Sequence, residues 1–194
     1  MKCVSLPVAA SAAFLLAGCG QYLGEYSVEA VAIAATIPIP GETAAHYGQF
    51  LEVSLSSETS LTALADKVDG VYVDADFCPL REPDEAIAFG PFSATGEELG
   101  LPSAASPLRP GADGRFHYRI YIPVAYRAQT VTQAGQIQLP TYDLRPADRD
   151  LCLQLSAPGY DLIRSRSDTI VVPAPVIAAA LTGETAANRR PAPR

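Results

Sequence analysis

Two histidines, His46 and His117, are the side chains of this chain best suited to proton transfer near neutral pH. His117 alternates with Arg115 and Arg119, and this period-two pattern predicts a solvated histidine on the outer face of a strand. His46 lies in a segment that the sequence predicts as a loop. With so few candidate bases, the sequence predicts no catalytic residue and no enzyme. A hydrolase that uses either histidine is the least favoured alternative.

Carboxylates are the second group that could do chemistry, and five of them gather around Cys78: Asp74, Asp76, Glu82, Asp84 and Glu85. Converging carboxylate oxygens can hold calcium, but this spacing fits no standard calcium loop. The pattern predicts a solvated strand face followed by an acidic turn, with no metal and no cofactor. An alternative stays open, in which this region or the loop at 101–114 binds a small ligand or a cation.

The first 18 residues have the layout of a secretory signal. Lys2 supplies a positive charge, the stretch from Val4 to Leu16 is apolar, and Ala17 and Gly18 are small. A bilayer-spanning helix needs about 20 apolar residues, so this stretch is too short to remain as a membrane span.

The five residues Leu-Leu-Ala-Gly-Cys at 15–19 resemble the lipobox of bacterial lipoproteins. This resemblance implies cleavage before Cys19 and acylation of Cys19, with palmitate-type chains that hold the protein on a membrane and facing the periplasm. Gly20 stands where an Asp would resemble an inner-membrane retention signal, so the outer membrane is favoured.

The chain that remains has the size of one domain. We predict a short tether at 19–25, which reaches about 25 Å, a single domain at 26–182 and a disordered tail at 183–194. Without Lys2, 13 Lys and Arg face 21 Asp and Glu, a balance of −8. Such a charge repels phosphate backbones, which argues against nucleic-acid binding.

The cysteines predict one disulfide. By the lipobox resemblance, Cys3 leaves with the signal and Cys19 is acylated, so Cys78 and Cys152 remain as a candidate pair in an oxidising compartment. Two free thiols or metal ligands are the alternative. Both cysteines fall opposite the apolar positions of their segments, which predicts a bridge near the surface or at strand ends.

Strand-like alternation dominates the mature chain and is clearest at 115–127. Pro123 within that segment predicts an edge strand or a bulge. Short helices are predicted at 58–67, 95–100 and 174–182. The other predicted strands are 28–37, 50–56, 71–78, 86–92, 137–141, 151–156 and an interrupted 160–172. About seven or eight strands and few helices predict an all-β antiparallel sandwich of immunoglobulin-like or transthyretin-like architecture.

These observations predict a membrane-anchored envelope lipoprotein without enzymatic activity, which acts as a structural or protein-interaction module. Its expected partners are the membrane, through the lipid, and other envelope proteins. The alternative is a periplasmic lipoprotein that binds a small ligand or a metal.

Overall fold

The computed structural model describes residues 20–39, 47–68, 70–80, 86–100, 107–126, 141–157 and 165–183. Within these ranges the chain is mostly strand, with two helices of eight residues each. The elements are β1 (Ser27–Ala34), β2 (Phe50–Ser57), α2 (Leu61–Val68), β3 (Tyr72–Phe77), β4 (Phe89–Ser93), β5 (Phe116–Pro123), β6 (Ala125–Tyr126), β7 (Tyr142–Asp143), β8 (Leu151–Ala157), β9 (Ser165–Arg166), β10 (Ile170–Val172) and α3 (Ala174–Leu181).

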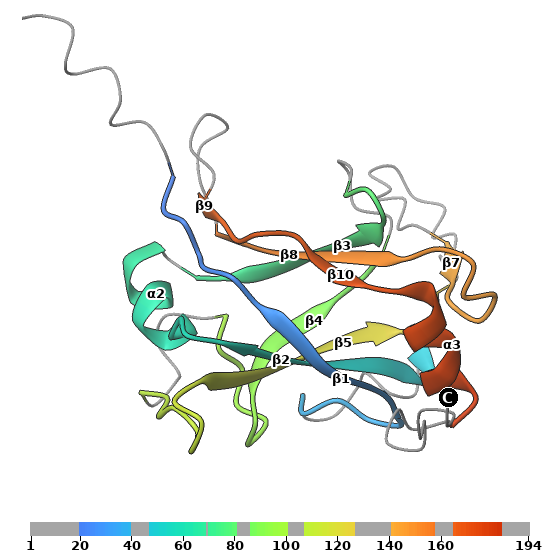
Figure 1. Ribbon diagram of the computed structural model, residues 1–194, viewed down its shortest axis with the longest axis horizontal. Helices are drawn as coiled ribbons and strands as arrows, with labels where there is room; N and C mark the ends of the chain where they lie inside the picture. The colour runs from blue at the N-terminus through green and yellow to red at the C-terminus, as the bar shows by residue number, and fades with distance from the viewer. Residues whose placement is uncertain are drawn as a thin grey trace, which may run out of the picture.

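The strands form an antiparallel all-β fold, as the sequence predicted (Figure 1). One sheet has the order β1-β2-β5-β4, and a second has the order β10-β8-β3 with β9 also on β8. A single apolar cluster takes side chains from both sheets, among them Val53 and Ile120 from the first and Leu153 and Leu155 from the second. Two sheets that share one core are compatible with the predicted sandwich.

Strand β5 shows why the alternating pattern folds in this way. Tyr118, Ile120 and Ile122 are buried in the shared core, while His117 and Arg119 lie on the other face and are partly exposed. Tyr121 departs from the pattern because it is buried in a smaller aromatic cluster on that outer face. Alternation therefore identified the inner face, whereas local packing covers part of the outer one.

Pro123 was predicted to mark an edge strand or a bulge, and that prediction is wrong: β5 is not at an edge, and its register with β2 runs unbroken through Pro123. Strand β5 lies between β2 and β4, and Pro123 is its last residue, opposite Phe50. The next residue, Val124, donates its N–H to the carbonyl of Gln49, and in an antiparallel ladder bonded pairs alternate with non-bonded ones. The proline nitrogen is thus directed away from β2, on the side where β4 has already stopped pairing.

The helices match two of the three predicted segments. Helix α2 lies within and just beyond 58–67, and α3 within 174–182. The segment 95–100 is not helical, because Ser93 and Glu97 close a turn and Glu98 bridges back to Phe92. No helix in the described ranges is long and apolar enough to cross a bilayer.

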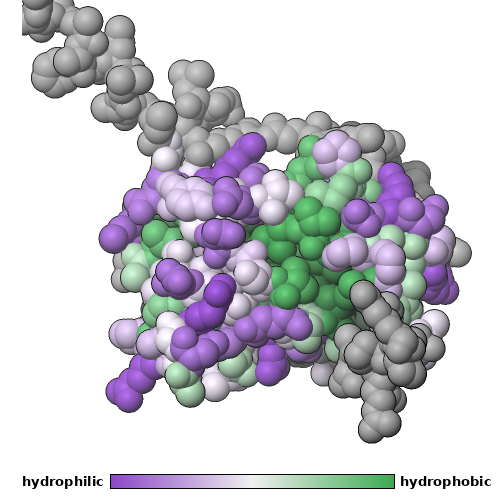
Figure 2. Space-filling model, in the orientation of Figure 1, coloured by the Kyte–Doolittle hydropathy of each residue, from purple (hydrophilic) through white to green (hydrophobic). Residues whose placement is uncertain are grey.

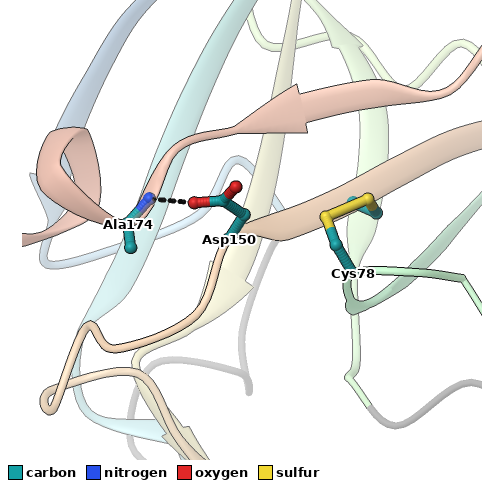
Figure 3. The surroundings of a disulfide bond; sticks show 4 residues. Cys78, Asp150 and Ala174 are labelled. Carbon is teal, nitrogen blue, oxygen red and sulfur yellow. Dashed lines mark hydrogen bonds between the residues drawn. A yellow bond between two sulfur atoms is a disulfide. The ribbon is translucent and has the colours of Figure 1, made fainter.

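Cys78 and Cys152 form a disulfide, with 5.0 Å between their Cα atoms (Figure 3). Cys152 lies in β8 and Cys78 directly follows β3, so the bond joins neighbouring strands of one sheet at the end of β3, as predicted. Asp150 reinforces this corner: its carbonyl accepts from the Cys78 N–H at 2.9 Å and its side chain from the Ala174 N–H at 2.8 Å. Asp150 thereby links the start of α3 to Cys78, one end of the disulfide.

Strands β1 and β10 begin side by side and diverge towards α3 (Figure 1). At the closed end, the Leu23 N–H donates to the Arg166 carbonyl at 3.0 Å and the Asp168 N–H to the Gly24 carbonyl at 3.2 Å. Helix α3 packs on β1 at the open end. In the described residues no strand pairs with the second edge of β1 or of β10.

Candidate functional site

His117 and two carboxylates form a cluster of three titratable side chains on the outer face of the first sheet. Nδ1 of His117 lies 3.0 Å from Oε2 of Glu29, and its Nε2 lies 3.2 Å from Oδ1 of Asp113. The three side chains are between about a third and a half exposed. His117 is therefore partly solvated, as predicted, but it also bridges two carboxylates from distant parts of the sequence.

Local backbone structure brings these groups together. Glu29 lies in β1 at an irregularity in its register with β2, between Val28 and Ala30. Asp113 belongs to a turn in which its Oδ1 also accepts from the Arg115 N–H at 3.1 Å. Gly111 allows the close approach, because a Cβ at that position would lie 2.9 Å from Nε2 of His117.

The geometry suits a protonated imidazole. A neutral ring carries one N–H and could donate to only one carboxylate, whereas the charged ring donates to both. The hydrogen bonds that His117 donates to Glu29 and Asp113 accordingly raise the pKa of His117 above its usual value. The backbone N–H of Arg115, together with His117, lowers the pKa of Asp113.

The same three residues could in principle hold a metal ion, since one ligand atom from each lies within 4.8 Å of the others. The two ring nitrogens of His117 point in different directions, however, and each carboxylate lies beside a different nitrogen. A single ion can bind only one of these nitrogens. The arrangement therefore fits two ion pairs better than one metal centre.

Replacing His117 with Gln is expected to cost stability in a pH-dependent way. Because the folded chain holds the His117 proton more tightly than the unfolded chain, the stabilisation is fully present below the unfolded pKa of about 6.5. It is lost as pH rises through the raised folded pKa. The effect should stay below about 1 kcal/mol, since these ion pairs are partly exposed. The melting temperatures of wild type and His117→Gln, compared between pH 5 and 9, measure this loss of stability. The range extends above pH 6.5 because the folded chain raises the pKa of His117.

The matched control is His46→Gln, which removes the only other imidazole of the chain. That variant should keep the pH dependence of the wild type. A destabilisation by His117→Gln that is the same at every pH would contradict the ion-pair interpretation. A rise in melting temperature with Zn²⁺ that only His117→Gln abolishes would support a metal site instead.

A second concave site lies where β3 ends beside β7. This pocket of about 600 Å³ is lined by Phe77, Tyr142, Asp143 and Arg149, among others. The guanidinium of Arg149 lies 3.9 Å from the centre of the Phe77 ring, which is a cation–π contact. None of the described lining residues is a histidine or a cysteine.

The acidic region around Cys78 differs from the prediction at one residue. Asp76 is fully buried, in register with Cys152, so this part of the strand face is covered instead of solvated. Tyr72, further along β3, is 48% exposed, in keeping with a solvated face. Glu82, Asp84 and Glu85 lie outside the described residues, as do Cys19 and His46.

An apolar strip follows the open side of the two sheets, where β10 and β1 diverge and α3 begins. Figure 2 shows strongly hydrophobic side chains gathered there. Val31 and Ile33 of β1 are only half buried, and Val171 of β10 and Val176 of α3 are 47% and 37% exposed. The sequence has no charged residue from Ile170 to Gly183 or from 30 to 39. We call this surface the apolar strip.

The sequence could not have revealed these groupings. Glu29 and Asp113 carry no signal that pairs them with His117, and Val31 and Ile33 have the pattern of ordinary core residues. The alanine-rich stretch at 174–182 was visible in advance, and it predicted a helix without saying which side of that helix stays open.

The described residues belong to the class of antiparallel all-β domains, with a disulfide between neighbouring strands of one sheet. No protein-family model, no curated protein and no solved structure matches the chain.

Proposed function

We propose that this protein is a membrane-anchored envelope lipoprotein that acts through protein contact and not through catalysis. The acyl chains on Cys19 hold it at a membrane, on the periplasmic side and with the outer membrane favoured. The apolar strip binds another envelope protein. The observation that carries the proposal is this strip, an uncharged surface on an otherwise acidic domain.

The strip is unusual for a surface that only faces water. Exposed apolar side chains scattered singly are normal, but apolar side chains that gather on one face mark contact sites. Val171 and Val176 belong to adjoining elements, and Val31 and Ile33 of nearby β1 are only half buried where they pack against the core. A protein partner with an apolar surface would bury them, with a favourable free energy of about 25 cal/mol for each Å² removed from water.

The position of the strip supports a partner other than the anchoring membrane. The blue segment that leads into β1 and strand β9 lie together at the upper left of Figure 1, and α3 lies at the right. An anchor on Cys19 therefore leaves the α3 end of the strip remote from the bilayer and open to envelope proteins.

A photo-cross-linking residue in place of Val176 is expected to give a discrete protein adduct in intact cells. The matched control is the same residue in place of Ala94, an exposed position just beyond β4 at the opposite edge of the first sheet. Ala94 should give no such adduct. Cys19→Ser should weaken the adduct at Val176, because a chain released from the membrane meets its partner less often.

Equal labelling from Val176 and Ala94 would count against the strip as a contact surface. An adduct at Val176 to lipid alone would show that this surface faces the bilayer. An adduct whose yield is unchanged in Cys19→Ser would show that the protein contact does not depend on the lipid anchor.

A second candidate function is binding of a small ligand or metal. One observation favours it, the meeting of Glu29 with Asp113 and His117 from two parts of the chain, although their geometry fits ion pairs better. The zinc titration described for His117→Gln tests it.

A further inference from the structure

The chain directly after Cys19 is fastened to the domain. The Gln21 N–H donates to Oγ of Ser165 at 2.8 Å, and the Leu23 N–H donates to the Arg166 carbonyl. Leu23 is fully buried in the main core. The segment predicted as a tether at 19–25 is therefore held against β9 from Gln21 onward.

Tyr22 and Gly24 strengthen this attachment. The Tyr22 hydroxyl donates to Oδ2 of Asp168 at 2.7 Å, and this bond raises the pKa of Tyr22 to about 12, so the phenol stays protonated. Gly24 has φ +101°, and a Cβ there would collide with the side chain of Thr59. The positive φ of Gly24 and the hydrogen bond from Tyr22 to Asp168 thus hold the same short segment in place.

A fastened segment leaves almost no free chain between the domain and its anchor. A residue spans at most about 3.5 Å, so the Cα of Cys19 lies within about 7 Å of that of Gln21. A free tether at 19–25 was predicted to reach about 25 Å. Because Gln21 and Leu23 are bonded to β9, Gln21–Glu25 is not such a tether. Acyl chains on Cys19 would bring this end of the domain into contact with lipid headgroups.

The surface at this end has groups of both signs. A pocket of about 360 Å³ is lined by Tyr22, Glu25, Glu58 and Arg115, among others. Guanidinium groups bind phosphate well, and carboxylates attract ammonium. Tyr22 is 57% exposed, and tyrosines are enriched where membranes meet water. This combination matches a headgroup that carries both a phosphate and an ammonium.

We propose that the β9 end of the domain is a membrane seat, in which Tyr22 and the pocket around Arg115 lie against a leaflet of zwitterionic phospholipid. The inference rests on the proposed acylation of Cys19 and adds to it an orientation and a lipid class. The phosphate of a headgroup lies at Arg115, and its ammonium lies near Glu25 and Glu58. The apolar strip then extends away from the bilayer.

Nitroxide labels test the seat in the acylated chain, purified from membranes and reconstituted in vesicles of phosphatidylcholine and phosphatidylethanolamine. One label replaces Thr169, exposed and next to Asp168; the control label replaces Thr182, exposed beyond α3. The label at Thr169 should become several-fold less accessible to a water-soluble nickel reagent on reconstitution. The label at Thr182 should not change.

The charge of the leaflet tests the headgroup contact. In phosphatidylglycerol vesicles, which lack the ammonium, protection at Thr169 should fall, because Glu25 and Glu58 repel the anionic surface. The double variant Glu25→Gln/Glu58→Gln should be protected equally in both kinds of vesicle. Equal protection of the wild type in both would overturn the choice of a zwitterionic leaflet.

Mass spectrometry of the same sample separates this inference from the proposed function. An acylated chain whose Thr169 label stays in water, or whose Thr182 label is protected instead, overturns the seat alone. An unmodified Cys19 overturns both the anchor and the seat.

Discussion

A chain in which Cys78 and Cys152 are both replaced by alanine is expected to unfold with a free energy about 4 kcal/mol below that of the wild type. The two cysteines are 74 residues apart in sequence, so the bond closes a long loop in the unfolded chain. Closing a long loop removes conformational entropy from the unfolded state and leaves the folded state relatively favoured. Urea unfolding of the mature chain in mild detergent measures the difference.

Reduction provides the matched control for the disulfide prediction. Dithiothreitol should lower the stability of the wild type to that of the double variant, and should leave the double variant unchanged. A double variant within about 1 kcal/mol of the wild type would show that the chain-entropy argument fails for this loop. Loss of the bond also loosens the corner at Asp150, which bonds both Cys78 and Ala174.

The fold class followed from the sequence because apolar side chains at period two can be buried only on one face of a strand. In β5 the pattern at Tyr118, Ile120 and Ile122 identified the core face, and in β8 the pattern at Leu153 and Leu155 did the same. These are local regularities, so no knowledge of the tertiary structure was needed to recognise them.

The position of β5 in its sheet was not predictable in the same way. Pro123 indicated an edge because a proline nitrogen cannot donate a ladder bond. The missing donor is tolerated where β4 has ended, and that depends on the relative lengths of two strands far apart in sequence. Strand order and strand overlap are tertiary facts.

The candidate sites also arise from tertiary structure. His117 was recognised from its strand pattern, but its partner Glu29 is 88 residues away in β1, and Asp113, although only four residues away, reaches it through the geometry of a turn. The attachment of Gln21 to β9 is a further example, since Ser165 follows it by 144 residues. Sequence analysis found the chemistry that depends on neighbouring residues and missed the contacts that depend on folding.

Leu153→Ala is expected to lower the free energy of unfolding by about 3 kcal/mol, because truncating a fully buried leucine loses its transfer free energy and leaves a cavity. Leu153 is fully buried in β8, the middle strand of its sheet, between Ala75 and Ile170, so the neighbours on both sides limit collapse into the space. The control is Val171→Ala on adjacent β10, which is 47% exposed and should cost less than about 1 kcal/mol. Urea unfolding of both variants measures the two losses. The slope of the unfolding free energy against urea concentration should stay as in the wild type. If Val171→Ala cost as much as Leu153→Ala, the apolar strip would be part of the core in solution and could not serve as the contact surface proposed for it.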